Sequence, residues 1–384
     1  MAVPRFLTAI IVLAGLATGA AVDGATASTR ALLPLPYAAQ ALSAYGGYVV
    51  FSQSDPNQNN WRLMVWHAGR VSALPIASRS IPFDADVGPD VRGRPAVVYS
   101  QCSTDPSGLF QVATPIIWTI GWTNASECRI YELSLVGGRG RLVKQIYARG
   151  SSDSTPSIWK GAIAFARISA SRPNVARVML WRPGRPAHEL PGGTLPCMTC
   201  PAGFPGPPGA WVSAMDLGPQ ALAFSWVLSG ENVLHGIALE MRIDPMGGGR
   251  PRIADAGVGQ EACTGGESSS VSSPNADGAQ IFYVVEIGDP CVGDSSTFET
   301  FAPSTGRWRS VSPSGGIIGA AAQDGGNTYW IQVKLGPPPP PPDRDLAQNQ
   351  GDCLPQHETC TLMQTKNLVL RPDPHHYRPY PPVR

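Results

Sequence analysis

Gly46-Gly-Tyr-Val-Val-Phe51 is the stretch that decides the fold, because its pattern recurs along the chain. In each copy a glycine precedes a short apolar run that contains an aromatic side chain. The other copies span residues 93–99, 161–165, 218–224, 278–282 and 326–330. Glycine marks a tight turn, and the runs are short and rich in strand-forming residues. Each copy therefore predicts a turn followed by a β-strand.

Further strands flank each run and complete units of four strands. A weaker strand precedes the glycine, as at 154–159, and two more follow the run, as at 61–66 and 69–75. Units of four antiparallel strands, repeated every 40 to 60 residues or so, are typical of β-propeller blades. The sequence predicts an all-β fold, a six-bladed propeller of four-stranded antiparallel blades. A β-sandwich and a seven-bladed ring are the alternatives.

The physics of a blade explains the apolar runs. One small sheet cannot bury either of its faces alone, whereas in a ring each face packs on the next blade. Inner strands are then covered on both sides and need not alternate between apolar and polar residues. The runs 49–51, 163–165 and 281–285 have this continuous apolar character.

One copy resembles a known repeat. Ser273-Pro-Asn-Ala-Asp-Gly-Ala-Gln-Ile-Phe282 is similar to the PD40 repeat (WD40-like) of secreted bacterial TolB-like propellers, whose consensus is Ser-Pro-Asp-Gly followed by an apolar strand ending in Phe. Asn275-Ala276-Asp277 stands here in place of the single Asp, and residues 153–165 are a looser match. The resemblance implies a secreted six-bladed propeller, a domain type that mostly binds other proteins.

Composition agrees with a folded β protein. Among 384 residues, 39 are Pro and 42 are Gly, which excludes long helices. Hydrophobic residues make up 43% and charged residues 15%, so the chain has enough apolar surface to fold. The net charge of +1 gives no reason to expect nucleic acid as a partner.

The N-terminus has the features of a secretory signal peptide over residues 1–27. Arg5 precedes the apolar run 6–16, and Ala25-Thr26-Ala27 fits a cleavage site before Ser28. We expect a protein that is secreted, extracellular or in the cell envelope, with no membrane span after cleavage. An uncleaved anchor is the alternative, although the run is short for a membrane span.

The rest of the chain is interpreted as one propeller domain over residues 28–370. Pro-rich insertions are expected at 192–210 and at 337–352, the second opening with six consecutive prolines. A domain boundary at these prolines is the alternative. The Pro-rich tail 371–384 is expected to be disordered.

Eight cysteines remain after cleavage, and an even count in an exported chain favours disulfides. They occur as four neighbouring pairs along the sequence. We therefore expect the bridges Cys102–Cys128, Cys197–Cys200, Cys263–Cys291 and Cys353–Cys360. For Cys197 and Cys200 a redox pair or half a zinc site is the alternative, but no second ligand pair follows.

Candidate chemistry is sparse, and we expect no catalytic residue, metal site or cofactor. The candidates that come nearest to a metal site are Asp84, Asp86 and Asp90, which could be ligands of a hard cation such as Ca²⁺. A polar turn that caps its own backbone is the other interpretation of these residues. His375-His376 is interpreted as a solvated chain end. Common nucleophile, zinc-protease and phosphate-loop motifs are absent from the sequence.

From these observations we expect a non-catalytic propeller that acts as a binding or scaffold module. Its ligand, an unknown protein or glycan, is expected to bind at one face of the propeller. The protein is expected to be a monomer. An extracellular glycan hydrolase is one alternative, and its carboxylates would have to meet in the central channel. Asp86, Asp153, Asp216 and Glu267 precede inner strands and are the candidates for it. A cell-wall protein held by its Pro-rich tail is the other alternative. A channel lined by small apolar and hydroxyl groups would favour binding.

Overall fold

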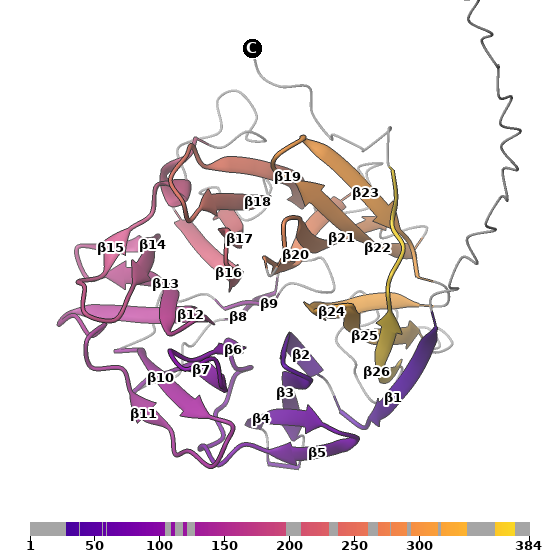
Figure 1. Ribbon diagram of the computed structural model, residues 1–384, viewed down its shortest axis with the longest axis horizontal. Helices are drawn as coiled ribbons and strands as arrows, with labels where there is room; N and C mark the ends of the chain where they lie inside the picture. Colours follow the sequence, from indigo (N-terminus) through magenta and orange to yellow (C-terminus); the bar gives the residue numbers. More distant parts are fainter. Residues whose placement is uncertain are drawn as a thin grey trace, which may run out of the picture.

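The structure is a computed structural model that describes residues 28–37, 39–55, 57–58, 60–103, 109–111, 118–120, 127–196, 209–229, 237–259, 268–276, 278–289, 293–313, 316–335 and 358–372. Its strands form antiparallel sheets that stand around a central axis (Figure 1). Among these residues no helix is long and apolar enough to cross a membrane. The predicted signal peptide lies outside the described residues.

Each blade is named here after the strand that lies nearest to the axis (Figure 1). The β2 blade contains β2 (Ala39–Tyr45), β3 (Tyr48–Asp55), β4 (Asn60–His67) and β5 (Arg70–Ala73). The β6 blade contains β6 (Ala85–Pro89), β7 (Pro95–Gln101), β10 (Arg129–Ser134) and β11 (Arg141–Leu142). The hairpin of β8 (Leu109–Gln111) and β9 (Trp118–Ile120) lies between β7 and β10 in the sequence.

The next two blades are joined. The β12 blade contains β12 (Ser151–Trp159), β13 (Ala162–Ser169), β14 (Arg172–Trp181) and β15 (His188–Glu189). The 3-10 turn η2 (Pro191–Thr194) precedes the β16 blade, which contains β16 (Gly209–Leu217), β17 (Ala221–Ser229), β18 (Ile237–Pro245) and β19 (Arg252–Gly259). One parallel pair between β14 and β16 merges these two blades into one sheet.

The last two blades bring distant parts of the sequence together. The β20 blade contains β20 (Ser268–Asn275), β21 (Ile281–Asp289), β22 (Gly293–Ala302), β23 (Arg307–Val311) and β27 (Arg371–Pro372). The β24 blade contains β24 (Ile317–Asp324), β25 (Asn327–Leu335), β26 (Glu358–Lys366) and the N-terminal strand β1 (Thr29–Leu35). Because β1 pairs with β26, the two ends of the chain close the ring.

The predicted all-β propeller class is confirmed. The number of blades stays a prediction, because the pair Val175–Ala210 merges two of the blades into one sheet. The apolar runs form the second strand of each blade rather than the strand nearest the axis. Phe51 of β3 and Phe165 of β13 are fully buried between neighbouring blades. The strands nearest the axis are the weaker ones, because they border the central cavity and carry small and polar residues.

The segment with the six prolines connects two neighbouring strands of one sheet, since β25 pairs with β26 along its length. All of the predicted 337–352 insertion lies outside the described residues, as does most of the 192–210 insertion. Arg371 and Pro372 pair with Ser310 and Arg309 of β23, so the paired chain extends two residues into the predicted tail. The expectation of disorder was wrong for these two residues, because the edge of β23 offers them backbone partners.

Gly88 of β6 lies at a close approach between the β6 and β12 blades. A Cβ atom at this position would lie 2.1 Å from the carbonyl oxygen of Ile158 in β12. We predict that Gly88→Ala lowers the free energy of unfolding in urea by about 2 kcal/mol, because it forces the two strands apart. Gly247→Ala is the matched control, since a Cβ there meets nothing within 4 Å. Equal losses in the two variants would contradict this explanation.

Candidate functional site

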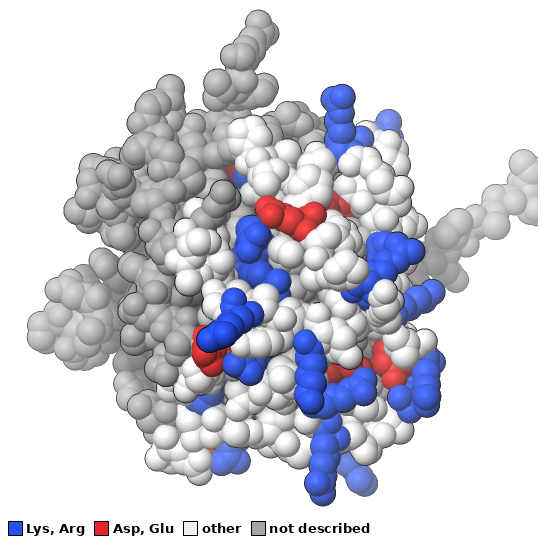
Figure 2. Space-filling model, turned by 90° about the vertical axis from the view of Figure 1, so that its left-hand side faces the viewer, with Lys and Arg blue, Asp and Glu red and all other residues white. Residues whose placement is uncertain are grey.

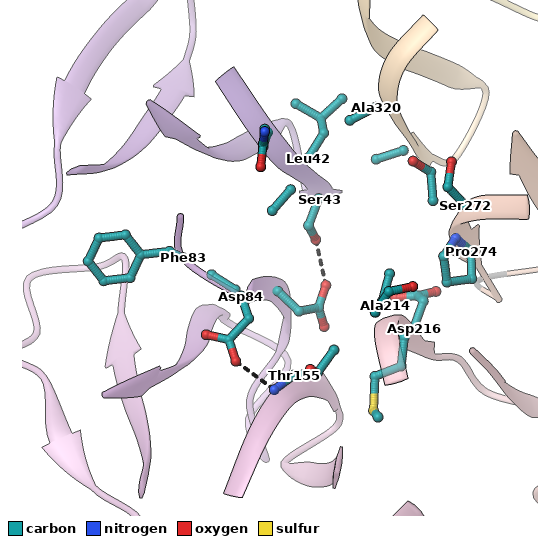
Figure 3. Close-up of a pocket in the computed structure, with 18 of the residues that line it drawn as sticks. Leu42, Ser43, Phe83, Asp84, Thr155, Ala214, Asp216, Ser272, Pro274 and Ala320 are labelled. Carbon is teal, nitrogen blue, oxygen red and sulfur yellow. Dashed lines mark hydrogen bonds between the residues drawn. The ribbon is translucent and has the colours of Figure 1, made fainter. Parts of the chain in front are cut away.

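The central cavity is the candidate site, and the strand nearest the axis of every blade contributes to it. Its volume, counted as space open to the centres of water molecules, is about 160 Å³. Figure 3 shows side chains from several blades converging on this space. The polar and charged lining residues are Gln40, Ser43, Asp84, Asp86, Thr155, Ser213, Asp216, Ser272, Ser273 and Asn275. Alanine, glycine, proline, Leu42, Phe83 and Met215 make up the rest.

Irregular backbone borders the cavity. Ala41, Thr155 and Ser273 have left-handed backbone conformations with φ of 54°, 47° and 50°, which is uncommon for residues other than glycine. In β2, β12 and β20 the strand register shifts next to these residues. A bulge leaves backbone groups unpaired with the adjacent strand and redirects side chains. Strained conformations of this kind cluster at functional sites, which makes the cavity the candidate here.

A chain of hydrogen bonds joins each of four innermost strands to the next one around the ring. In every case a side-chain oxygen on one strand accepts a hydrogen bond from a backbone N–H that lies on the following innermost strand or directly after it. The bonds are Val87 N–H to Ser43 Oγ (3.0 Å), Ile158 N–H to Asp86 Oδ2 (2.8 Å), Leu217 N–H to Ser157 Oγ (2.7 Å) and Ala276 N–H to Asp216 Oδ2. Asn275 continues the ring by donating from Nδ2 to the carbonyl of Gln323 (3.2 Å).

Asp86 holds three blades together. Besides the Ile158 N–H, its carboxylate accepts hydrogen bonds from Ser43 Oγ (2.5 Å) of β2 and Ser157 Oγ (2.8 Å) of β12. Figure 3 shows the bond from Ser43. Burial raises the pKa of Asp86, and the hydrogen bonds that it accepts offset part of this effect. The carboxylate is therefore engaged on both oxygens by structural partners.

Asp84 is also held on both oxygens. Its Oδ2 accepts a hydrogen bond from the Thr155 N–H (2.6 Å), and Ser100 Oγ lies 2.6 Å from Oδ1 (Figure 3 shows the first bond). Arg79 forms a buried ion pair with Oδ1 at 3.1 Å. The cavity wall thus carries acidic side chains whose carboxylate oxygens are hydrogen-bonded to other residues of the protein.

The three carboxylates proposed as the nearest candidates for a metal have different surroundings. Asp84 and Asp86 line the cavity, whereas Asp90 caps the turn after β6 by accepting hydrogen bonds from the N–H groups of Arg92 and Arg94. Hydrogen bonds and the charge of Arg94 lower the pKa of Asp90 against the opposing effect of burial. Within the described part of the chain no three His, Cys, Asp or Glu side chains gather closely enough to hold a metal ion.

Of the carboxylates considered for a glycan hydrolase, Asp86 and Asp216 line the cavity. Asp153 does not: it forms a buried ion pair with Arg167 at 2.6 Å within its own blade. Burial raises the pKa of Asp153, and Arg167 opposes this effect. Glu267 and the His375-His376 pair lie outside the described residues.

The structure contains the expected Cys102–Cys128 disulfide, which links the end of β7 to the start of β10. Cys360 of β26 is disulfide-bonded as well. The remaining cysteines, namely Cys197, Cys200, Cys263, Cys291 and Cys353, lie outside the described residues. Their pairing stays a prediction.

A second cluster of buried charges lies in the β16 blade, away from the residues that line the cavity. Glu240, Arg242 and Asp244 alternate along β18 and are at most 2% exposed. Arg242 donates to Glu240 Oε2 from Nε (2.8 Å) and from Nη2 (2.5 Å), and from Nη1 to the carbonyl of Gly192 (2.8 Å). Asp244 accepts from the Gly192 N–H at 2.9 Å. The cluster therefore anchors η2 against β18.

Asp244 makes this anchor sensitive to pH. Burial raises the pKa of Asp244 to about 6, against an ordinary value of 3.8. The folded state therefore binds a proton more tightly than the unfolded state, and stability falls as pH rises through this interval. We predict that wild type loses about 2 kcal/mol of unfolding free energy relative to Asp244→Asn between pH 4 and 6. Urea unfolding across this range measures it, and parallel curves for the two proteins would contradict it.

Sequence reasoning identified Asp86 and Asp216 but missed their bonding partners. Ser43 and Ser157 are unremarkable in the sequence because hydroxyl residues are common in turns and strands. The available signal was a polar residue five to nine positions before the start of the apolar second strand, as for Ser43 before Tyr48 and Asp86 before Pro95. The alternation of Glu240, Arg242 and Asp244 is typical of a solvent-exposed strand face, and only the packing of η2 onto it reverses this interpretation.

Antiparallel blades around a central cavity define the chain as a β-propeller. No protein-family model matches it, and no curated protein matches it. The PD40 resemblance therefore stays a prediction. Solved propellers are similar in fold, among them TolB from Acinetobacter baumannii, at 12% identity over 85% of this chain and 65% of TolB with a TM-score of 0.42.

Two further solved structures have comparable similarity. The β-propeller domain of the Trilobed protease from Pyrococcus furiosus is 6% identical over 77% of this chain and 91% of that domain, with a TM-score of 0.40. Puromycin hydrolase is 11% identical over 78% of this chain with a TM-score of 0.40, and the present chain spans 50% of its length. Similarities this distant carry no argument about function.

Proposed function

We propose that the protein is an exported, non-catalytic binding module whose central cavity receives a polar group of its partner. The observation that carries this proposal is the state of the cavity carboxylates. Asp84 and Asp86 are each hydrogen-bonded on both oxygens, and Asp216 accepts from the next blade. A general acid or base has to be able to exchange a proton with its substrate. These carboxylates instead hold neighbouring blades together through hydrogen bonds.

The chemistry of the lining supports the same proposal. Apart from Gln40, Leu42, Phe83, Met215 and Asn275, the lining residues are small, hydroxyl-bearing or acidic, and none of the lining residues is a His, Lys, Cys, Tyr or Glu. Such a wall offers acceptors for hydrogen bonds and a negative potential, so it favours a hydroxyl or ammonium group over an anion. The group that enters is therefore expected to be an amine-bearing side chain or a sugar hydroxyl of the partner.

Export is supported by the N-terminal pattern of the sequence and by the Cys102–Cys128 disulfide. Disulfides form and persist in oxidising compartments. Together these features favour a protein that meets its partner outside the cytoplasm.

Filling the cavity tests the proposal. Ala214 lines the cavity and is half-buried, so Ala214→Trp should occupy the space without replacing a polar residue (Figure 3). Ala170→Trp, in the exposed turn after β13, is the matched control. In a pull-down from culture supernatant followed by mass spectrometry, the partner should be recovered with wild type and Ala170→Trp and lost with Ala214→Trp. Equal recovery with both variants would contradict binding in the cavity.

A glycan hydrolase is the second candidate, because three aspartates line one cavity. Glycoside hydrolysis uses a pair of carboxyl groups that flank the scissile bond. Release of reducing ends from a panel of polysaccharides by wild type, and its loss in Asp216→Asn, would favour this candidate over the binding module. The absence of any release, together with retained partner capture, is the result expected for a binding module.

A further inference from the structure

Positive charge is concentrated in one sector of the ring. Residues 127–196, which the structure describes without a gap, contain eleven Lys or Arg and four Asp or Glu, a net charge of +7 in a chain whose total is +1. The remainder of the chain is correspondingly acidic. This segment builds the outer strands of the β6 blade and all of the β12 blade. The near-neutral total therefore conceals a strongly basic surface.

The cations gather on the short turns of these two blades. We use the name basic band for Arg92, Arg139, Arg141, Lys160, Arg182 and Arg185. They lie in or next to the turns β6–β7, β10–β11, β12–β13 and β14–β15. In an antiparallel blade the first and third turns lie at the same end, and hydrogen bonds place neighbouring turns together. Gly161 N–H donates to the Pro89 carbonyl (3.1 Å), and Leu135 N–H donates to the Pro95 carbonyl (3.1 Å).

Most side chains of the basic band form no ion pair with a residue that the structure describes, although the Asp90 carboxylate lies in the same turn as Arg92. Among the described residues, Arg92, Arg139, Lys160, Arg182 and Arg185 form no ion pair, while Arg141 pairs with Glu132 and remains 76% exposed. Exposed pairs of this kind contribute little stability, so Arg141 can change partner at small cost. Figure 2, which views the rim of these blades, shows basic side chains across the face and along its edge with few acidic ones between them.

We propose that the basic band binds an acidic polysaccharide, a polymer that carries carboxylate or sulfate groups along its length. Arginine guanidinium groups match carboxylate and sulfate oxygens with two hydrogen bonds at once. Two further arginines lie on the curved rim: Arg129 and Arg177 are 31% and 35% exposed, and they form ion pairs with Glu127 at 3.1 Å and Glu189 at 3.9 Å. Exposed ion pairs of this kind contribute little stability, so these arginines can change partner at small cost. A flexible polymer can follow such a curve, whereas a flat membrane contacts one plane.

Nucleic acid is the less favoured anionic polymer. Tyr147, an exposed aromatic residue of this segment, is covered by the Arg129 guanidinium at 4.3 Å from the ring centre. One face of this ring is therefore not free for base stacking, which single-stranded nucleic acid uses. The basic band is a different surface from the central cavity, so this proposal does not depend on the proposed function.

Two triple variants with the same change in net charge test the proposal. Arg139→Gln/Lys160→Gln/Arg185→Gln removes half of the basic band. Arg250→Gln/Arg307→Gln/Arg309→Gln removes three exposed arginines from the β16 and β20 blades and is the control. Affinities for heparin, as the sulfated probe, and for polygalacturonate, as the carboxylated probe, are measured against salt concentration. Thermal melting of both variants verifies that they fold.

Loss of three cationic contacts should weaken binding by about tenfold or more at physiological salt and flatten the salt dependence. The control variant and Ala214→Trp should bind both polymers as wild type does. Equal weakening in the two triple variants, or no binding by wild type, would overturn the proposal. The other outcome is that wild type binds duplex DNA or phosphatidylglycerol vesicles more tightly than both polysaccharides, with this binding lost in the triple variant of the basic band. That result would overturn the assignment of the partner.

Discussion

Replacing Asp86 with alanine should destabilise the protein by about 3 kcal/mol, because the donors that it satisfies lie in buried positions on two other blades. The Ile158 N–H is fixed in β12 and cannot turn toward another acceptor, while the hydroxyls of Ser43 and Ser157 can rotate. Urea unfolding at neutral pH measures the loss. The raised pKa of Asp86 shows that burying this carboxyl is itself costly, and that cost is removed in the variant.

Asp55→Ala is the control for this experiment. Asp55 pairs with Arg62 at 3.6 Å, and both side chains are solvent-accessible, so the expected loss is below about 1 kcal/mol. The comparison also separates a structural role for Asp86 from a catalytic one. Residues kept for catalysis are often neutral or unfavourable for stability. If Asp86→Ala is as stable as wild type or more stable, Asp86 does not hold the blades together, and the hydrolase is favoured.

The architecture could be predicted from sequence because its signals are local. Each glycine-to-aromatic run became a buried second strand, as in Tyr48–Asp55 and Ala162–Ser169. The pairing of Thr29–Leu35 with Glu358–Lys366 could not be predicted, since the partners lie more than 300 residues apart and no local pattern in one strand specifies the other. Closing of the ring is thus a property of tertiary structure alone.

The candidate site was predictable only in part, for a related reason. Asp86 and Asp216 stood out because a carboxylate before an apolar strand is conspicuous, and both line the cavity. Asp153 has the same local pattern, yet it forms an ion pair with Arg167 on the neighbouring strand. The register of β12 against β13 determines which side chains of β12 face the axis. This register shifts between Ser154 and Ser157. Sequence patterns do not specify such shifts.

The basic band shows the same limit at the surface. A net charge of +1 indicated no charged partner, because the sum over the whole chain hides its distribution. Arg92 and Lys160 are distant in sequence but lie on adjoining turns, where Gly161 packs against Val91. Only the ring brings such turns together, so the surface had to be seen in three dimensions.

Arg242→Met should destabilise the β16 blade by about 3–5 kcal/mol at neutral pH, because it leaves the buried carboxylates of Glu240 and Asp244 without their cation. Arg242 makes two hydrogen bonds to Glu240, one to the Gly192 carbonyl, and lies 5.0 Å from the ring of Trp226. Desolvation lowers the pKa of Arg242, and the neighbouring carboxylates oppose this effect. The charges therefore depend on one another, and part of the loss should be regained as pH falls and the carboxylates bind protons.

A double variant tests whether the loss of stability in Arg242→Met comes from the buried carboxylate of Glu240, which no longer has its cationic partner. Glu240→Leu/Arg242→Met replaces both charged partners with apolar side chains, and such replacements of buried ion pairs are often neutral or stabilising. Most of the stability lost in Arg242→Met should return in the double variant, as measured by urea unfolding. The lost bond to Gly192 and the lost contact with Trp226 are common to both variants, so they cancel in the comparison. If the double variant is as unstable as Arg242→Met, the guanidinium acts through Gly192 and Trp226 instead, and the electrostatic explanation is wrong.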